Sequence, residues 1–128
     1  MSNTTAKPPT VLAIDDEPGI LDIVKTVLEA EGYVVLTAAN GPAGVELYKQ
    51  HWRDIRAVLV DYMMPGMNGD AVFEQLRQIN PAAPVLLVSG SADRARQSGM
   101  LTKGLRGVVH KPFYLDELIR QVAEVAQA

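Results

Sequence analysis

Short apolar runs recur along the chain and alternate with longer segments of mixed character. Runs rich in β-branched residues occupy positions 10–14, 33–38, 57–60, 84–88 and 106–110. Their length, and the Gly, Pro, Asn and Asp residues that follow several of them, predict strands, and the run 57–60 has the composition of a strand buried on both faces. The alternation of strands with longer segments indicates an α/β fold.

The longer segments carry apolar residues at helical spacing. Gly32 should end the first helix, Asn40 should cap the second, and Asn80-Pro81 should close the third. Trp52 and His51 are expected to cover the edge of the core at the end of the second helix. Segment 91–103 is weakly patterned, because its apolar positions are sparse and Ser98-Gly99 interrupts it. The apolar positions of the other helices are Ile20, Ile23, Val24, Val27 and Leu28; Val45 and Leu47; Val72, Leu76 and Ile79; and, on an inner face, Leu115, Leu118, Ile119, Val122 and Val125.

Five strands alternating with five helices predict one flavodoxin-like, doubly wound domain over residues 10–127. Right-handed crossovers and the small size favour a parallel sheet in the order 2-1-3-4-5, with helices on both faces. At 128 residues, 48% of them apolar, the chain suffices for one domain with a core and is too short for two. Residues 1–9 are small and polar and end in Pro-Pro, which predicts a disordered tail.

Charge and composition exclude several classes of function. The net charge of -3 and the lack of a basic run argue against nucleic acid or an anionic membrane as partner. The longest apolar runs are strand-sized, which predicts no membrane span, and the polar start does not resemble a secretion signal. Without cysteine, disulfide and thiolate chemistry cannot operate. A cytoplasmic protein fits these features best.

Polar residues follow the strands that should border the central crevice. Asp15 and Asp16 follow the first strand, Asp61 the third, Ser89 the fourth and Lys111 the fifth. Because the carboxyl ends of parallel strands share one edge, these side chains should converge. Asp16 could instead act as the N-cap of the following helix, with Pro18 in its first turn.

Such a cluster favours a divalent cation. Three carboxylates about 4 Å apart repel one another by roughly 1 to 4 kcal/mol per pair, depending on the effective dielectric. Oxygen ligands beside a phosphate-sized gap suit Mg²⁺, for which Mn²⁺ could substitute. With the Lys111 ammonium and the Ser89 hydroxyl nearby, the set predicts a carboxylate that accepts a phosphoryl group.

Four motifs in order resemble the receiver domain of two-component response regulators. The resemblance implies that Asp61 is the phosphoacceptor, that the Lys111-Pro112 peptide bond is cis, and that the phosphoryl donor is a phosphohistidine on a sensor histidine kinase or phosphotransfer protein, or a small donor such as acetyl phosphate. It further implies a signalling phosphoacceptor that catalyses only its own phosphorylation and dephosphorylation. The motifs are Asp15-Asp16-Glu17-Pro18, the stretch 61–69, Ser89-Gly90 and Lys111-Pro112-Phe113.

The same resemblance assigns roles around Asp61. Asp15 and Asp16 would hold Mg²⁺ together with Asp61 and the backbone carbonyl of Met63. Ser89 would bind a phosphoryl oxygen and act in switching, and Lys111 would pair with the phosphate.

Val108 and Met63 bear on how the domain passes on its signal and on how long the phosphoryl group stays on Asp61. The family has an aromatic residue three positions before the Lys, where this chain has Val108. We therefore hypothesise that output relies on rearranging segment 91–103, and by resemblance we expect partner contacts on the fourth helix, fifth strand and fifth helix. Met63, two residues after Asp61, should slow hydrolysis by excluding the attacking water, unless it merely fills a gap beside Met64 and Met67.

Other functions fit less well. A nucleotide or flavin module of this fold needs a Gly- or Ser/Thr-rich phosphate loop where Asp15 and Asp16 stand. A phosphatase with an aspartyl-phosphate intermediate needs a second acid where Met63 stands. The remaining rival is a receiver-like module that works without phosphorylation. The chain is either a regulator that acts on a downstream protein target or the receiver of a longer protein whose output domain is missing.

Overall fold

The computed structural model describes residues 8–91 and 93–127, so most of the predicted tail lies outside the described residues. Within them, a parallel sheet has the order β2-β1-β3-β4-β5, which confirms the predicted topology. The strands are β1 (Thr10–Ile14), β2 (Val34–Ala38), β3 (Ile55–Asp61), β4 (Val85–Ser89) and β5 (Gly107–His110). The helices are α1 (Pro18–Ala30), α2 (Gly41–His51), α3 (Gly69–Ile79), α4 (Asp93–Gln97) and α5 (Leu115–Ala126), with a 3-10 turn, η1 (Met100–Lys103).

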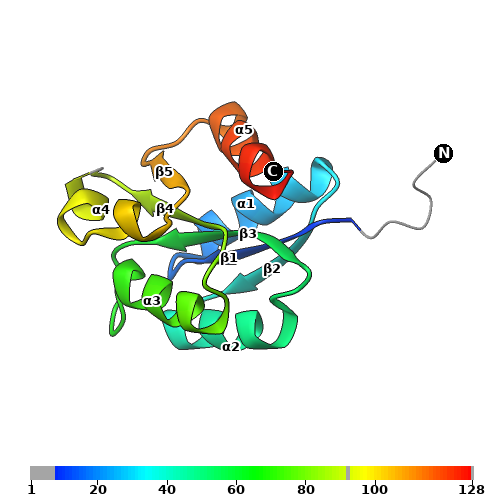
Figure 1. The fold of residues 1–128 in the computed structure, drawn as a ribbon. Coiled ribbons are helices and arrows are strands. Elements are labelled where there is room, and N and C mark those ends of the chain that lie inside the picture. Colours follow the sequence, from blue (N-terminus) through cyan, green and yellow to red (C-terminus); the bar gives the residue numbers. More distant parts are fainter. Residues whose placement is uncertain (1–7, 92, 128) are drawn as a thin grey trace.

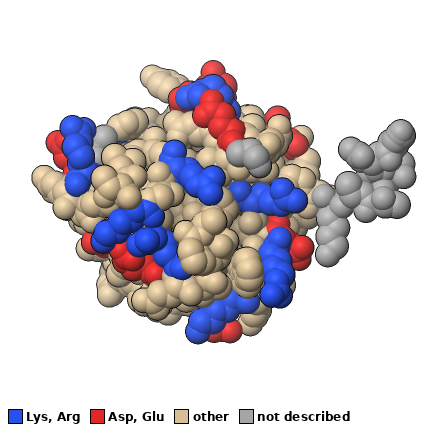
Figure 2. All heavy atoms as spheres, viewed as in Figure 1, with Lys and Arg blue, Asp and Glu red and all other residues tan. Residues whose placement is uncertain are grey.

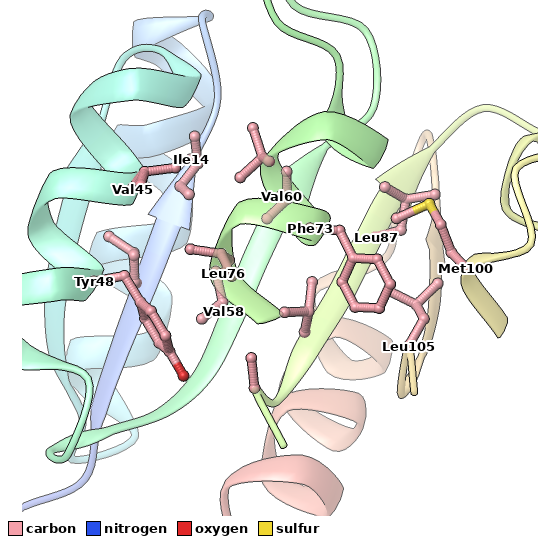
Figure 3. Packing of buried hydrophobic residues seen from close by; sticks show 14 of the residues in the cluster. Ile14, Val45, Tyr48, Val58, Val60, Phe73, Leu76, Leu87, Met100 and Leu105 are labelled. Atoms are coloured by element: carbon pink, nitrogen blue, oxygen red, sulfur yellow. The ribbon is translucent and has the colours of Figure 1, made fainter. Parts of the chain in front are cut away.

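Helices cover both faces of the sheet (Figure 1). Alternate residues of β1 point to opposite faces, so Leu12 and Ile14 pack beneath α2 and α3, whereas Val11 and Ala13 pack beneath α1 and α5. Figure 3 shows the first of these clusters, in which the buried rings of Tyr48 and Phe73 come from α2 and α3. β1 and β4 are buried along their whole length, which is why they read as unbroken apolar runs, whereas the edge strands β2 and β5 are partly exposed.

The helix termini explain one wrong prediction and one confirmed one. Asp16 is not the N-cap of α1: Glu17 holds that position, and within the described residues no side chain caps it. Instead, Asp15 accepts a hydrogen bond from the Glu17 N–H at 2.9 Å, while Asp16 lies one residue too early to cap. Asn40 does cap α2, since its side chain accepts from the Ala43 N–H at 2.8 Å.

The end of α2, segment 91–103 and the start of α5 bear on further predictions. Trp52 packs partly buried against the core as predicted, whereas His51, the last residue of α2, is exposed, contrary to prediction. Segment 91–103 divides into α4 and η1, and the left-handed Gly99 (φ 73°) lies between them, where the sequence predicted an interruption. Leu115 is 45% exposed, contrary to prediction, because it is the first residue of α5 and the buried stripe begins only at Leu118.

Candidate functional site

The carboxyl edge of the sheet brings the predicted acids together. Asp15 and Asp16 follow β1, and Asp61 is the last residue of the neighbouring β3. One carboxylate oxygen from each lies within 4.8 Å of the others. Asp15 and Asp61 are only 4% and 5% exposed, so two of the three carboxylates have lost most of their water.

Lys111 enters this cluster from the end of β5. Its Nζ lies 3.0 Å from Oδ1 of Asp61, 3.7 Å from Oδ2 of Asp15 and 3.6 Å from Oε1 of Glu17. The Lys111 N–H donates to the Ser89 carbonyl at 2.9 Å, and the Lys111-Pro112 peptide bond is cis. Sequence reasoning gave Glu17 no role, although its place in the acidic run after β1 was a usable signal.

A cavity of about 300 Å³ opens beside Asp61. Its lining includes Lys111, Ser89 and Met63, and Met63 is 63% exposed. The Ser89 hydroxyl donates to the Ser91 carbonyl at 3.0 Å and accepts from the Ser91 N–H at 3.1 Å. Ser91 was not predicted to line the site. The cavity therefore offers an ammonium and a hydroxyl next to a buried carboxylate.

Burial and crowding shift the titration of the acids. Burial raises the pKa of Asp15 to about 6, a shift opposed by the Glu17 N–H and reinforced by the charge of Asp61. Burial also raises the pKa of Asp61, although Lys111 pulls it down. Burial lowers the pKa of Lys111, but its hydrogen bond to Asp61 and nearby carboxylates outweigh this effect and raise the pKa overall. Lys111 thus stays charged amid an excess of carboxylates.

The donor set fits a hard divalent cation. Asp15, Asp16 and Asp61 offer converging oxygen atoms, and the pKa values of the two buried acids are raised chiefly by burial, which Lys111 alone does not offset. Mg²⁺ takes few carboxylates and keeps several waters, which suits a cluster open to a cavity. The predicted role of the Met63 backbone carbonyl as a further ligand stays a prediction.

Gly69 packs against the backbone that carries Asp61. A Cβ on Gly69 would lie 2.9 Å from the Asp61 carbonyl oxygen and 2.9 Å from Cα of Tyr62. The Gly69 N–H donates to the Tyr62 carbonyl at 2.7 Å. The start of α3 therefore fixes the loop after β3, a positioning role that the sequence marked only as a turn.

Val108 occupies the place of the expected aromatic residue. It pairs with Leu87 across β4 and β5 and packs, partly buried, against the α2 and α3 side of the core. Valine has no aromatic ring, so the movement of an aromatic side chain toward Ser89 cannot occur at this position.

Comparisons with known proteins agree with this geometry. The family model "Response regulator receiver domain" matches residues 11–123. The chain is 34% identical over 119 residues to the probable transcriptional regulatory protein TcrX of Mycobacterium tuberculosis, covering 93% of this chain and 50% of TcrX. It is 33% identical to the hybrid signal transduction histidine kinase D of Dictyostelium discoideum, covering 91% of this chain but 8% of that kinase. The chain thus spans half or less of these relatives.

Solved structures are similar over nearly the whole chain. A response regulator receiver domain protein from Clostridium thermocellum superposes with a TM-score of 0.86 at 26% identity, covering 93% of this chain and 94% of that one. The CheX-CheY-BeF3-Mg²⁺ complex from Borrelia burgdorferi gives a TM-score of 0.85 at 27% identity, covering 94% of this chain and 91% of that one.

Proposed function

The chain belongs to the response regulator receiver domain family, and on that premise we propose that Asp61 accepts a phosphoryl group from a phosphohistidine. A carboxylate oxygen of Asp61 attacks phosphorus, an acyl phosphate bond forms, and the phosphorus–nitrogen bond to the donor imidazole breaks. The imidazole keeps the electron pair of that bond and gains a proton. The observation that carries this proposal is the buried Asp61 carboxylate on the wall of an open cavity, 3.0 Å from Lys111.

The chain's own groups suit the charge that develops on the phosphoryl oxygens. The Lys111 ammonium can move its hydrogen bond from Asp61 to a phosphoryl oxygen. The Ser89 hydroxyl, which now donates to the Ser91 carbonyl, can redirect its proton to another. Asp15, Asp16 and Asp61 would hold Mg²⁺, which would neutralise phosphoryl charge and orient the group.

Membership of this family supports a class of phosphoryl donor and a kind of downstream partner. Receiver domains pair with histidine kinases and phosphotransfer proteins, and one relative of this chain is itself a hybrid histidine kinase. We propose the same class of donor here, and control of a downstream protein or a linked output domain as the result. Within residues 8–91 and 93–127, the structure contains no helix that could span a membrane.

The phosphoacceptor is tested directly with acetyl phosphate and Mg²⁺. Mass spectrometry of the intact protein should show one added phosphoryl group, which Asp61→Asn should abolish. Asp22→Asn, an exposed acid on α1, is the matched control and should be labelled like wild type. If Asp61→Asn were still labelled, another residue would be the phosphoacceptor. No labelling of the wild type would favour the rival reading, a receiver-like module that works without phosphorylation.

We further propose that output runs through segment 91–103. Ser89 is hydrogen-bonded to Ser91 at the start of this segment, and Lys103 at its end pairs with Glu74 of α3 at 3.0 Å. A Ser89 hydroxyl redirected to the phosphoryl group would release the Ser91 carbonyl and so loosen α4. Beryllofluoride should therefore change amide exchange from Ser91 to Val109; unchanged exchange there would contradict this route.

A further inference from the structure

A second concave surface lies at the opposite, amino-terminal edge of the sheet. Two adjoining hollows of about 290 and 320 Å³ share Arg53, Arg56 and Ala126. We call them together the arginine groove, defined by Arg53, Arg56, Arg106, Trp52, Val125 and Ala126. In Figure 2, basic side chains cross the middle of the molecule, on the face where Figure 1 shows the end of α5.

The groove is positive on a chain that is negative overall. Among its described lining residues are three arginines and a single acid, Asp54, whereas the whole chain carries a net charge of -3. None of the ion pairs within residues 8–91 and 93–127 involves Arg53, Arg56 or Arg106. Their positive charge is thus available to an anionic ligand.

Two of the arginines are already held in place. The Arg106 guanidinium donates to the Ala82 carbonyl at 3.2 Å, and that of Arg53 lies 4.9 Å above the Trp52 ring. Holding these long side chains reduces the rotamer entropy that ligand binding would otherwise cost. A guanidinium fork binds a carboxylate through two parallel hydrogen bonds, so three of them favour a ligand with several acidic groups.

The groove also has an apolar wall. Ile55 is buried at the start of β3, and Pro84, Val125 and Ala126 line the same hollow. A ligand that carried only charged groups would leave the apolar wall exposed to water. An apolar side chain between two carboxylates would cover it. We propose that the arginine groove binds an acidic peptide segment of a partner protein that carries one apolar side chain among its carboxylates.

Nucleic acid fits this surface less well. Three arginines beside Asp54 can neutralise few phosphates, and the net charge of the chain repels a long polyanion. A short acidic segment can bind the positive arginine groove without extending over the rest of the protein surface, which is negative overall.

The groove is spatially separate from the proposed phosphoacceptor. Arg56 is the second residue of β3 and Asp61 is its last, so the strand places them roughly 16 Å apart at about 3.3 Å per residue. A partner held at the arginine groove would leave the cavity beside Asp61 open. This inference therefore does not depend on the proposed phosphorylation.

The test uses a fluorescein-labelled peptide in which four glutamates flank one leucine, with fluorescence anisotropy at low salt. Arg56→Gln and Arg106→Gln should each weaken binding by about five- to tenfold, because each removes a guanidinium–carboxylate contact. Arg120→Gln is the matched control: it removes the same charge from α5, where Arg120 pairs with Glu117 and Glu124, and should change affinity less than about twofold. A peptide with glutamine for glutamate should not bind.

Three results would overturn the proposal. They are no measurable binding, an equal loss in Arg120→Gln, and tighter binding of a single-stranded oligonucleotide of equal charge. Each variant is first unfolded in urea. A cooperative unfolding transition shows that the variant is folded, so a loss of peptide affinity then reflects a change in the arginine groove.

Discussion

The Nζ of Lys111 lies 3.0 Å from Oδ1 of Asp61, although β4 and the whole of segment 91–103 separate the two residues in the chain. The contact exists because β3 and β5 flank β4 and all three strands end at the same edge of the sheet. It places one cation against the acid that we propose to be phosphorylated.

Replacing Lys111 by Met should slow phosphorylation of Asp61. A hydrogen bond to a charged group contributes about 1.5 to 3 kcal/mol, so losing it in the transition state corresponds to a rate roughly 10- to 100-fold lower. The rate is measured by mass spectrometry with acetyl phosphate and Mg²⁺. Lys103→Met is the control, since Lys103 pairs with Glu74 away from the cavity and should leave the rate unchanged. Equal rates in wild type and Lys111→Met would exclude contact between this ammonium and the phosphoryl group.

The stability of the metal-free protein should fall as pH rises through the range from about 4 to about 6. The folded state raises the pKa of Asp15 from 3.8 to about 6, so it binds this proton more tightly than the unfolded chain does. At about 1.4 kcal/mol per pKa unit, the charged Asp15 then lowers the free energy of unfolding by up to roughly 3 kcal/mol above pH 6.

Asp15→Asn tests this linkage. In EDTA at about pH 7.5 the variant should be more stable than wild type in urea, and the two should converge at about pH 4, where the Asp15 carboxyl is protonated in the wild type. Mg²⁺ should stabilise the wild type at neutral pH and have much less effect on the variant. A variant less stable than wild type at neutral pH would show that the Asp15 charge is stabilising instead.

Gly69→Ala should damage both stability and the site. Its Cβ would lie 2.9 Å from backbone atoms of Asp61 and Tyr62, which cannot swing away as a side chain could. Overpacking of this kind costs about 1 to 3 kcal/mol and should displace Asp61, which slows its phosphorylation. Gly19→Ala in α1 meets no atom within 4 Å, so it should be neutral or stabilising by up to about 1 kcal/mol. Thermal unfolding and labelling rates check both variants, and unchanged values for Gly69→Ala would contradict the positioning role.

Met63→Asn should shorten the lifetime of the acyl phosphate. Met63 lines the cavity beside Asp61 and is 63% exposed, so an amide in its place would offer hydrogen bonds to a water molecule near the acyl phosphate. The lifetime is followed by mass spectrometry after removal of acetyl phosphate. Met67→Leu is the control, because Met67 packs against the core instead. Equal lifetimes in wild type and Met63→Asn would leave Met63 a gap-filling role only.

Much of the fold could be predicted because the apolar pattern of the strands agrees with their place in the parallel sheet. The apolar runs of β1 and β3 predicted buried parallel strands, and the turn residues after them placed Asp15 and Asp61 at the strand ends. Two helix predictions were wrong, and both concern the first residues of a helix. Glu17 displaced Asp16 as N-cap, and Leu115 stayed exposed because α5 only begins there.

The sequence by itself determined the strand order and the set of polar residues at the carboxyl edge, because strand length, turn residues and the handedness of crossovers are local properties. The tertiary structure alone decided which side chains touch. Only there does Glu17 lie near Lys111, and only there do Arg56 of β3 and Arg106, which precedes β5, border one groove. Such contacts depend on the packing of distant segments, which no local pattern encodes.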